Sequence, residues 1–193
     1  MSVNPSAENL AKAAKAANVK GPPPVEDWNP PFCGDLDMRI ARDGTWFYLG
    51  TPIGRPSLVR LFSSIIRKDD QDYFLVTPVE KVGITVDDAP FVANDFTVEG
   101  AGLEQRVTFT THVGDNMLAG PDHPIRVAFD AETGEPSPYI HVRRNLEALI
   151  DRKSFYRLVE LGALADHDGE EWFGLWSSGE FFPLATAASL EMS

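Results

Sequence analysis

The sequence predicts an α+β protein that is built from two sheet-plus-helix halves. Three observations support this fold class. Short alternating or apolar runs are separated by Gly, Asp and Pro, a pattern that is typical of β-strands joined by turns. Two longer segments have the apolar spacing of amphipathic helices. A short strand motif occurs twice, each time ahead of one of these helices.

The repeated motif is Arg-(Ile/Val)-Ala-x-Asp, which begins at Arg39 and again at Arg126. In each copy we expect a hairpin turn, a second strand and then a helix, which begins at Ser57 in the first copy and at Asn145 in the second. The agreement of motif, element order and spacing favours an internal duplication. The alternative is a chance resemblance between two strand-turn-strand-helix units.

The chain divides into three predicted parts. Residues 1–21 form an N-terminal Ala/Lys segment that is helical or disordered, because its composition favours helix but supplies almost no apolar stripe. Residues 22–90 form the first α+β half, which opens with a Pro-rich connector anchored by Trp28. Residues 91–193 form the second half, which is mainly antiparallel β with one helix.

The first half is expected to contain a hairpin at Asp43-Gly44. This dipeptide predicts a two-residue type I′ turn, because both central positions of that turn require positive φ. Pairing Arg42 with Thr45 then divides the hairpin into two faces. One face is apolar core and carries Met38, Ile40, Phe47 and Leu49. The other face carries Asp37, Arg39, Trp46 and Tyr48.

The remaining elements follow from periodicity and from helix-capping signals. A helix is expected from Ser57 to Lys68, with Pro56 in its first turn. A second helix is expected between Asn145, a good N-cap, and Gly162, a good stop. Strands are expected at residues 73–76, 79–86, 91–98, 103–111 and 125–129, and a last hairpin at residues 171–176 and 180–184.

Composition bounds the partners and the location. The 193-residue chain has a formal net charge of −12, which argues against binding to duplex DNA or to an anionic membrane. Its one cysteine, Cys33, fits a reducing compartment. No apolar run approaches the ~18 residues that a membrane helix needs, and the N-terminus lacks the apolar core of a signal peptide. A cytoplasmic protein is therefore expected.

Catalytic signatures are missing from the sequence. It contains no phosphate-binding loop, no dinucleotide fingerprint, no zinc-protease motif and no nucleophile elbow. The four histidines lack metal-ligand spacing, so we expect no metal and no cofactor. Asp35 and Asp37 lie on one strand face and could serve a metal-dependent hydrolase. A solvated strand edge is the favoured interpretation, and the chain is expected not to be an enzyme.

Arginines are the most informative residues for binding. In the repeat alignment Arg39 is equivalent to Arg126, and Arg55 lies near the position of Arg143. Arginines beside flat aromatic rings suit a ligand with a phosphate and a base. The predicted ligand-binding residues are Arg39, Trp46, Tyr48, Arg55, Arg126 and Arg143. In the alternative, the arginines pair with the excess of acids and the aromatic rings fill the seam between the halves.

Several stretches together resemble a bacterial family of uncharacterised proteins, the domain of unknown function 1285 family. They are P-P-V-E-D-W-N-P-P at residues 23–31, G-D-L-D-M-R-I-A-R-D-G-T-W-F-Y at 34–48, P-I-G-R at 52–55, L-V-T-P-V-E-K-V-G-I-T-V-D-D-A-P-F at 75–91 and N-L-E-A-L-I-D-R-K-S-F-Y at 145–156. The resemblance extends from about residue 22 to the C-terminus. It implies a duplicated α+β core whose C-terminal half is superficially pleckstrin-homology-like. It further implies a ligand site between the halves that suits a nucleotide-like molecule, and a role in signalling. No catalytic residues are established for the family.

The function predicted from the sequence is that of a ligand-binding or sensory protein in signal transduction. An anionic, nucleotide-like small molecule is expected to bind between the two halves. The alternative is a protein–protein interaction module with no small-molecule ligand. The sequence determines neither the ligand's identity nor the oligomeric state.

Overall fold

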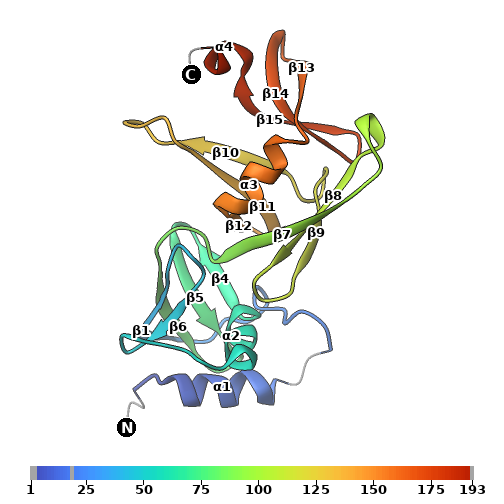
Figure 1. Cartoon of the computed structure of the whole chain (residues 1–193). Coiled ribbons are helices and arrows are strands. Elements are labelled where there is room, and N and C mark those ends of the chain that lie inside the picture. Colours follow the sequence, from blue (N-terminus) through green and yellow to red (C-terminus); the bar gives the residue numbers. More distant parts are fainter. Residues whose placement is uncertain (1–3, 18–19, 192–193) are drawn as a thin grey trace. The chain divides into compact units, whose positions relative to one another are not determined.

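The computed structural model describes residues 4–17 and 20–191. It divides the chain into two compact units, Met1–Pro90 and Phe91–Ser193. Each unit contains one six-stranded sheet, and the second unit adds a three-stranded sheet. The fold is therefore α+β, as the sequence predicts, with β-structure dominating both units (Figure 1).

The sheet of the first unit has the strand order β3-β2-β1-β6-β5-β4. Its strands are β1 (Phe32–Ile40), β2 (Trp46–Tyr48), β3 (Thr51–Pro52), β4 (Ile66–Asp69), β5 (Asp72–Val76) and β6 (Lys81–Val86). Helix α2 (Pro56–Ser63) follows β3. The core of this unit contains Met38, Ile40, Trp46 and Phe62, all of which are almost fully buried.

The N-terminal helix α1 (Ala7–Ala16) lies against α2 (Figure 1). Ser6 caps it by accepting a hydrogen bond from the backbone N–H of Asn9. Leu10 is only 1% exposed, and Ala7 and Ala11 are buried beside it. The segment is therefore helical over Ala7–Ala16, which is one of the two predicted states, and one leucine flanked by small alanines is enough to dock the helix. Met1–Val3 and Asn18–Val19, which belong to the same predicted segment, lie outside the described residues.

The sheet of the second unit has the order β10-β11-β12-β7-β8-β9. Its strands are β7 (Phe91–Glu99), β8 (Arg106–Thr111), β9 (Asn116–Leu118), β10 (Ile125–Phe129), β11 (Pro136–Arg143) and β12 (Leu146–Ile150), with the short helix η1 (Gly102–Glu104) between β7 and β8. Helix α3 (Arg152–Val159) follows β12. The three-stranded sheet contains β13 (Ala163–His167), β14 (Glu170–Ser177) and β15 (Glu180–Thr186), and α4 (Ala187–Leu190) comes last.

Both six-stranded sheets have the same topology. In each, two antiparallel meanders of three strands are joined by a parallel pairing between the first and the last strand, β1 with β6 and β7 with β12. The matching order of all six strands supports the predicted duplication. The alignment behind that prediction is wrong, however. Arg39 lies on β1, the first strand of its sheet, whereas Arg126 lies on β10, the fourth strand, whose counterpart is β4.

The hairpin between β1 and β2 forms with a register that differs from the prediction. Its loop is closed by Ala41, which donates to the carbonyl oxygen of Thr45, and not by Arg42. Asp43 accepts a hydrogen bond from the backbone N–H of Thr45, and Gly44 adopts a φ of 90°. This geometry needs one residue more than a type I′ turn. Because side chains alternate along a strand, the slip reverses the faces of β2.

The two predicted long helices are both shorter than expected. Residues 66–69 form the edge strand β4, because the hydroxyls of Ser63 and Ser64 bond to carbonyls of the last turn of α2, where the helix ends. Residues 146–150 form β12, whose parallel pairing with β7 buries four of its five residues. Asp151 then caps α3. No helix in the described part of the chain is long and apolar enough to cross a membrane.

Candidate ligand-binding site

A row of side chains crosses the face of the first sheet opposite its core. Backbone pairing places Arg67 on β4 beside Phe74 on β5, Phe74 beside Gly83 on β6, and Gly83 beside Asp35 on β1. Each of these residues has one neighbour along its strand that is buried on the other face, and these neighbours are Ile66, Leu75, Val82 and Leu36. The row therefore belongs to the outer face of the sheet, and it combines a cation, an aromatic ring, a glycine and a carboxylate.

An irregularity in β1 places Asp35 over Gly83. Phe32 pairs with Lys81 and Asp35 pairs with Gly83, so β1 has one residue more than β6 between these two pairs. Within this bulge, Gly34 has a φ of 100°. Such bulges redirect a side chain, and only glycine adopts that backbone conformation readily. A Cβ atom added to Gly83 would lie 2.2 Å from the Oδ1 atom of Asp35. Gly83 is therefore the residue that leaves room for this carboxylate.

An open pocket with a volume of about 480 Å³ lies at this point. Its aromatic walls are Phe32 and Phe74, whose rings meet edge to face with centroids 6.0 Å apart. Phe32 is 57% exposed, so its ring presents apolar surface at the pocket. The lining also includes Asp35, Asp72, Tyr73, Lys81, Gly83 and Ile84.

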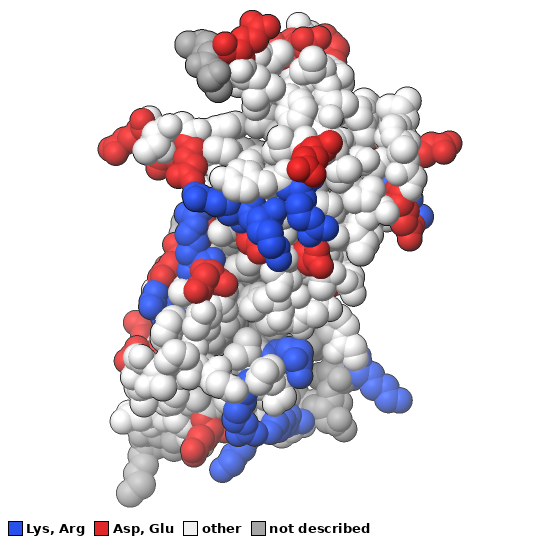
Figure 2. Space-filling view, in the orientation of Figure 1, with Lys and Arg blue, Asp and Glu red and all other residues white. Residues whose placement is uncertain are grey.

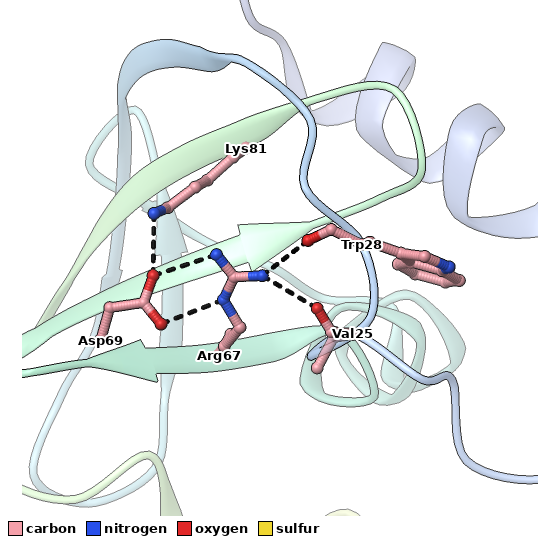
Figure 3. Close-up of polar contacts among 5 residues, drawn as sticks. All are labelled: Val25, Trp28, Arg67, Asp69 and Lys81. Atoms are coloured by element: carbon pink, nitrogen blue, oxygen red, sulfur yellow. Dashed lines mark hydrogen bonds and ion pairs between the residues drawn. The ribbon is translucent and has the colours of Figure 1, made fainter.

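Lys81, which lines the pocket, belongs to a network of charges with Arg67 and Asp69 (Figure 3). The Nε and Nη2 atoms of Arg67 each donate to Asp69 at 3.0 Å. The Nη1 atom of Arg67 donates to the carbonyl oxygens of Val25 at 2.9 Å and Trp28 at 2.8 Å. Lys81 donates to Asp69 at 2.8 Å, and its Nζ atom lies 4.1 Å from the centre of the Phe74 ring. Arg67 thereby ties the Pro-rich connector to the sheet.

The charges of this network determine the ionisation of Asp69. Burial raises the pKa of the Asp69 carboxyl, but the hydrogen bonds from Lys81 and Arg67 outweigh burial and lower this pKa below its ordinary value. Asp69 is thus a carboxylate that already holds two cations. The positive charge of Lys81 is correspondingly committed to a partner inside the protein.

The predicted binding residues of the first unit do not form the expected face. Trp46 and Tyr48 lie on the same side of the hairpin as Met38 and Ile40, because Ile40 pairs with Trp46 and Arg39 pairs with Phe47. Trp46 is 2% exposed and stacks on Phe62. The prediction that these two aromatics share a face with Arg39 is therefore wrong. Tyr48 accepts a hydrogen bond from Ala7 in α1.

The arginines of the predicted site have varied surroundings. Arg39 forms an ion pair with Asp87 and lies over the ring of Phe47. Arg55 is exposed at the N-cap of α2. In the second unit, Arg126 pairs with Glu147, and Arg143 pairs with Asp115. Burial lowers the pKa of the Arg143 guanidinium. A role of these arginines in binding an anion stays a prediction.

The basic side chains of the second unit also include an exposed group on α3. Figure 2 shows Lys and Arg side chains gathered in this region. Arg152 donates to Glu135 at 2.5 Å, and Arg157 donates to Asp95 at 2.7 Å, where it holds the pKa of that carboxyl below its ordinary value. In the part of the chain that the structure describes, no three His, Cys, Asp or Glu side chains come together as a metal site.

Sequence reasoning did not select most of the pocket residues. In the sequence, Asp35 stands out only as half of a carboxylate pair with Asp37, and no motif marks Phe32, Phe74 or Gly83 as binding residues. One signal could have found them. Gly83 interrupts the apolar strand V-E-K-V-G-I-T-V, and a glycine inside a strand often marks a bulge or the close approach of another group.

Comparisons with known proteins identify relatives of both units. A family model described as "Domain of unknown function (DUF1285), N-terminal domain" matches residues 23–89, and "Protein of unknown function (DUF1285), C-terminal domain" matches residues 90–184. A search of curated proteins returns no match to the chain.

Two crystal structures are similar to this chain. A DUF1285 family protein from Silicibacter pomeroyi DSS-3 is 65% identical, with a TM-score of 0.85 over 94% of this chain and 97% of that chain. A DUF1285 family protein from Shewanella baltica OS155 is 30% identical, with a TM-score of 0.50 over 65% of this chain and 91% of that chain.

Proposed function

The chain belongs to the DUF1285 family, and we propose that it is a binding or sensory protein that holds a small organic ligand in the pocket of its first unit. The observation that carries this proposal is the arrangement of Asp35 over Gly83. The bulge in β1, the glycine in β6 and the exposed ring of Phe32 together leave a concave site with aromatic walls and a carboxylate. Ligand sites commonly combine apolar walls with a few convergent polar groups.

The pocket does not resemble an anion site. Its lining contains two carboxylates, Asp35 and Asp72, and one cation, Lys81, which already bonds to Asp69. A nucleotide-like anion, a role in signal transduction and a pleckstrin-homology-like second half stay predictions.

The proposal is tested by ligand binding to the full chain and to two glycine variants. A panel of small ring compounds, including amines, alcohols, carboxylates and nucleotides, is screened by thermal shift, and hits are titrated by calorimetry. In Gly83→Ala the new Cβ would meet Asp35, so binding is expected to weaken about tenfold or more while the variant remains folded. Gly54→Ala is the matched control, because a Cβ at Gly54 meets nothing within 4 Å.

The outcomes separate the proposal from its alternative. Binding that is lost in Gly83→Ala and kept in Gly54→Ala supports a ligand site in this pocket. If no compound binds, or if Gly83→Ala binds hits as well as the unchanged chain does, the proposal fails. A protein–protein interaction module without a small ligand would then become the favoured function.

A further inference from the structure

The two carboxylates that line the pocket differ from Asp69 in their surroundings. Asp69 receives hydrogen bonds from Arg67 and Lys81. Within the described residues, the carboxylates of Asp35 and Asp72 take part in no hydrogen bond or ion pair. Asp35, Asp72 and Asp69 carry three negative charges against the two positive charges of Arg67 and Lys81, so the pocket and its bordering network keep a net negative charge beside an exposed aromatic ring.

We infer that the ligand carries a protonated amine, which Asp35 binds, and an apolar ring, which packs against Phe32. This inference rests on the proposed function, because it assigns the chemical class of the ligand in that same pocket. Opposite charge and a charge-assisted hydrogen bond favour an ammonium group beside Asp35. An anionic ligand is disfavoured, since its charge would face two carboxylates.

The protein already contains one ammonium group that contacts both an aromatic ring and a carboxylate. The ammonium group of Lys81 lies over the ring of Phe74 and donates to the carboxylate of Asp69. Cations are attracted to the negative face of an aromatic ring, and the attraction adds to that of a nearby carboxylate. In the same lining, Phe32 and Asp35 supply a second ring and a second carboxylate. An ammonium group of a ligand could contact the Phe32 ring and the Asp35 carboxylate, as the Lys81 ammonium contacts the Phe74 ring and the Asp69 carboxylate.

The position of Asp35 favours it over Asp72 as the main partner. Asp35 extends over Gly83, at the centre of the row that crosses the sheet, whereas Asp72 lies at the start of β5 next to the turn from β4. The glycine makes room for this carboxylate within the pocket lining. Asp72 then contributes to the negative potential without direct contact.

The test uses three compounds of the same size, which are 2-phenylethylamine, 2-phenylethanol and phenylacetate. Binding to the full chain is measured by calorimetry at low and at high salt. The amine is expected to bind about three- to fivefold more tightly than the alcohol at low salt, and the acid most weakly. High salt is expected to reduce the preference, because screening weakens exposed charge pairs.

Variants of β1 locate the partner of the amine. Asp35→Asn is expected to remove the preference for the amine while leaving the affinity for the alcohol unchanged. Asp37→Asn is the control, since it removes the same charge from the same strand outside the pocket lining. Gly83→Ala is expected to weaken all compounds that occupy the pocket.

The failure of this inference is distinguishable from the failure of the proposed function. If the alcohol or the acid binds as tightly as the amine, and Gly83→Ala abolishes that binding, the pocket is a ligand site but the amine is not its ligand class. If Asp37→Asn removes the amine preference as fully as Asp35→Asn does, Asp35 is not the specific partner. If none of the three compounds binds but another compound of the wider panel does, and Gly83→Ala abolishes that binding, the inference fails and the proposed function stands. If no compound of the panel binds, both are overturned.

Discussion

The two six-stranded sheets share one topology but differ in the row that crosses their fourth, fifth, sixth and first strands. In the first sheet the row is Arg67, Phe74, Gly83 and Asp35. In the second sheet the corresponding pairings give Arg126, Tyr139, Leu149 and Val92. Both rows begin with an arginine opposite an aromatic ring, and they diverge at the third and fourth positions.

This divergence explains why the pocket occurs in the first sheet. Leu149 and Val92 are 8% and 5% exposed, so the second sheet has buried apolar side chains where the first sheet has Gly83 and the exposed Asp35. A leucine in place of a glycine replaces the pocket of the first sheet with buried apolar packing and leaves the strand order unchanged. In a duplicated fold, the two copies can thus share a topology and differ in their surface.

Arg67 and Arg126 occupy corresponding positions of the two sheets, but their contacts predict different contributions to the free energy of unfolding. Arg67 is 13% exposed and bonds to a carboxylate and to two backbone carbonyls. Arg126 is 56% exposed, pairs with Glu147 and lies over the ring of Tyr139. Exposed ion pairs contribute little, whereas removing a partly buried donor leaves its acceptors without partners.

The largest expected effect follows from this contrast. Arg67→Ala should lower the free energy of unfolding by about 2–3 kcal/mol, because the carbonyl oxygens of Val25 and Trp28 lose the donor and Asp69 keeps only its bond from Lys81. Arg126→Ala should lower it by about 1 kcal/mol or less. Urea unfolding followed by circular dichroism measures both values. Equal losses in the two variants would contradict the view that Arg67 is the structural anchor of the connector.

A smaller effect concerns two carboxyl groups that border β5 and β6. The pKa of Asp69 lies below its ordinary value, whereas burial raises the pKa of Glu80. Ionised Asp69 therefore contributes stability above its ordinary pKa, and this contribution is lost as the pH falls through the lowered pKa. Protonated Glu80 contributes stability below its ordinary pKa, which is lost as the pH rises through the raised one.

The two substitutions should accordingly act in opposite directions at neutral pH. Asp69→Asn should lower the free energy of unfolding, and Glu80→Gln should raise it slightly. Both differences should shrink at about pH 3.5, near the ordinary pKa values of carboxyl groups. Urea unfolding at the two pH values provides the measurement. A Glu80→Gln variant that is less stable at neutral pH than the unchanged chain would show that ionised Glu80 is not penalised by burial.

The sequence predicted the fold class and most of the strands, because alternation and turn residues are local signals. It could not separate helix from strand at residues 146–150, since Leu146, Leu149 and Ile150 fit the spacing of both. These residues form a strand because they pair in parallel with β7, which is distant in the sequence. The turn at Asp43-Gly44 was recognised, but its length was not, and one residue was enough to move Trp46 from the expected site into the core.

The candidate site was harder to predict than the fold. Arginines and tryptophans drew attention by residue type, whereas the pocket depends on Gly83, a residue without a side chain, and on a bulge at Gly34. The sequence does not show which strand pairs with β6, because this depends on contacts between segments that are far apart along the chain. The proximity of Asp35 to Gly83 therefore becomes visible only when β1 and β6 pair in parallel.

The central claim is that ligand binding belongs to the first sheet and not to its counterpart, and titration of the ¹⁵N-labelled full chain with 2-phenylethylamine tests it most directly. Amide shifts are expected at Lys81, Gly83 and the residues around Asp35, with little change along β10, β11 and β12. The same titration of Gly83→Ala should show no shifts in the pocket. Saturable shifts confined to the second sheet, or an unchanged spectrum at saturating amine, would contradict the account.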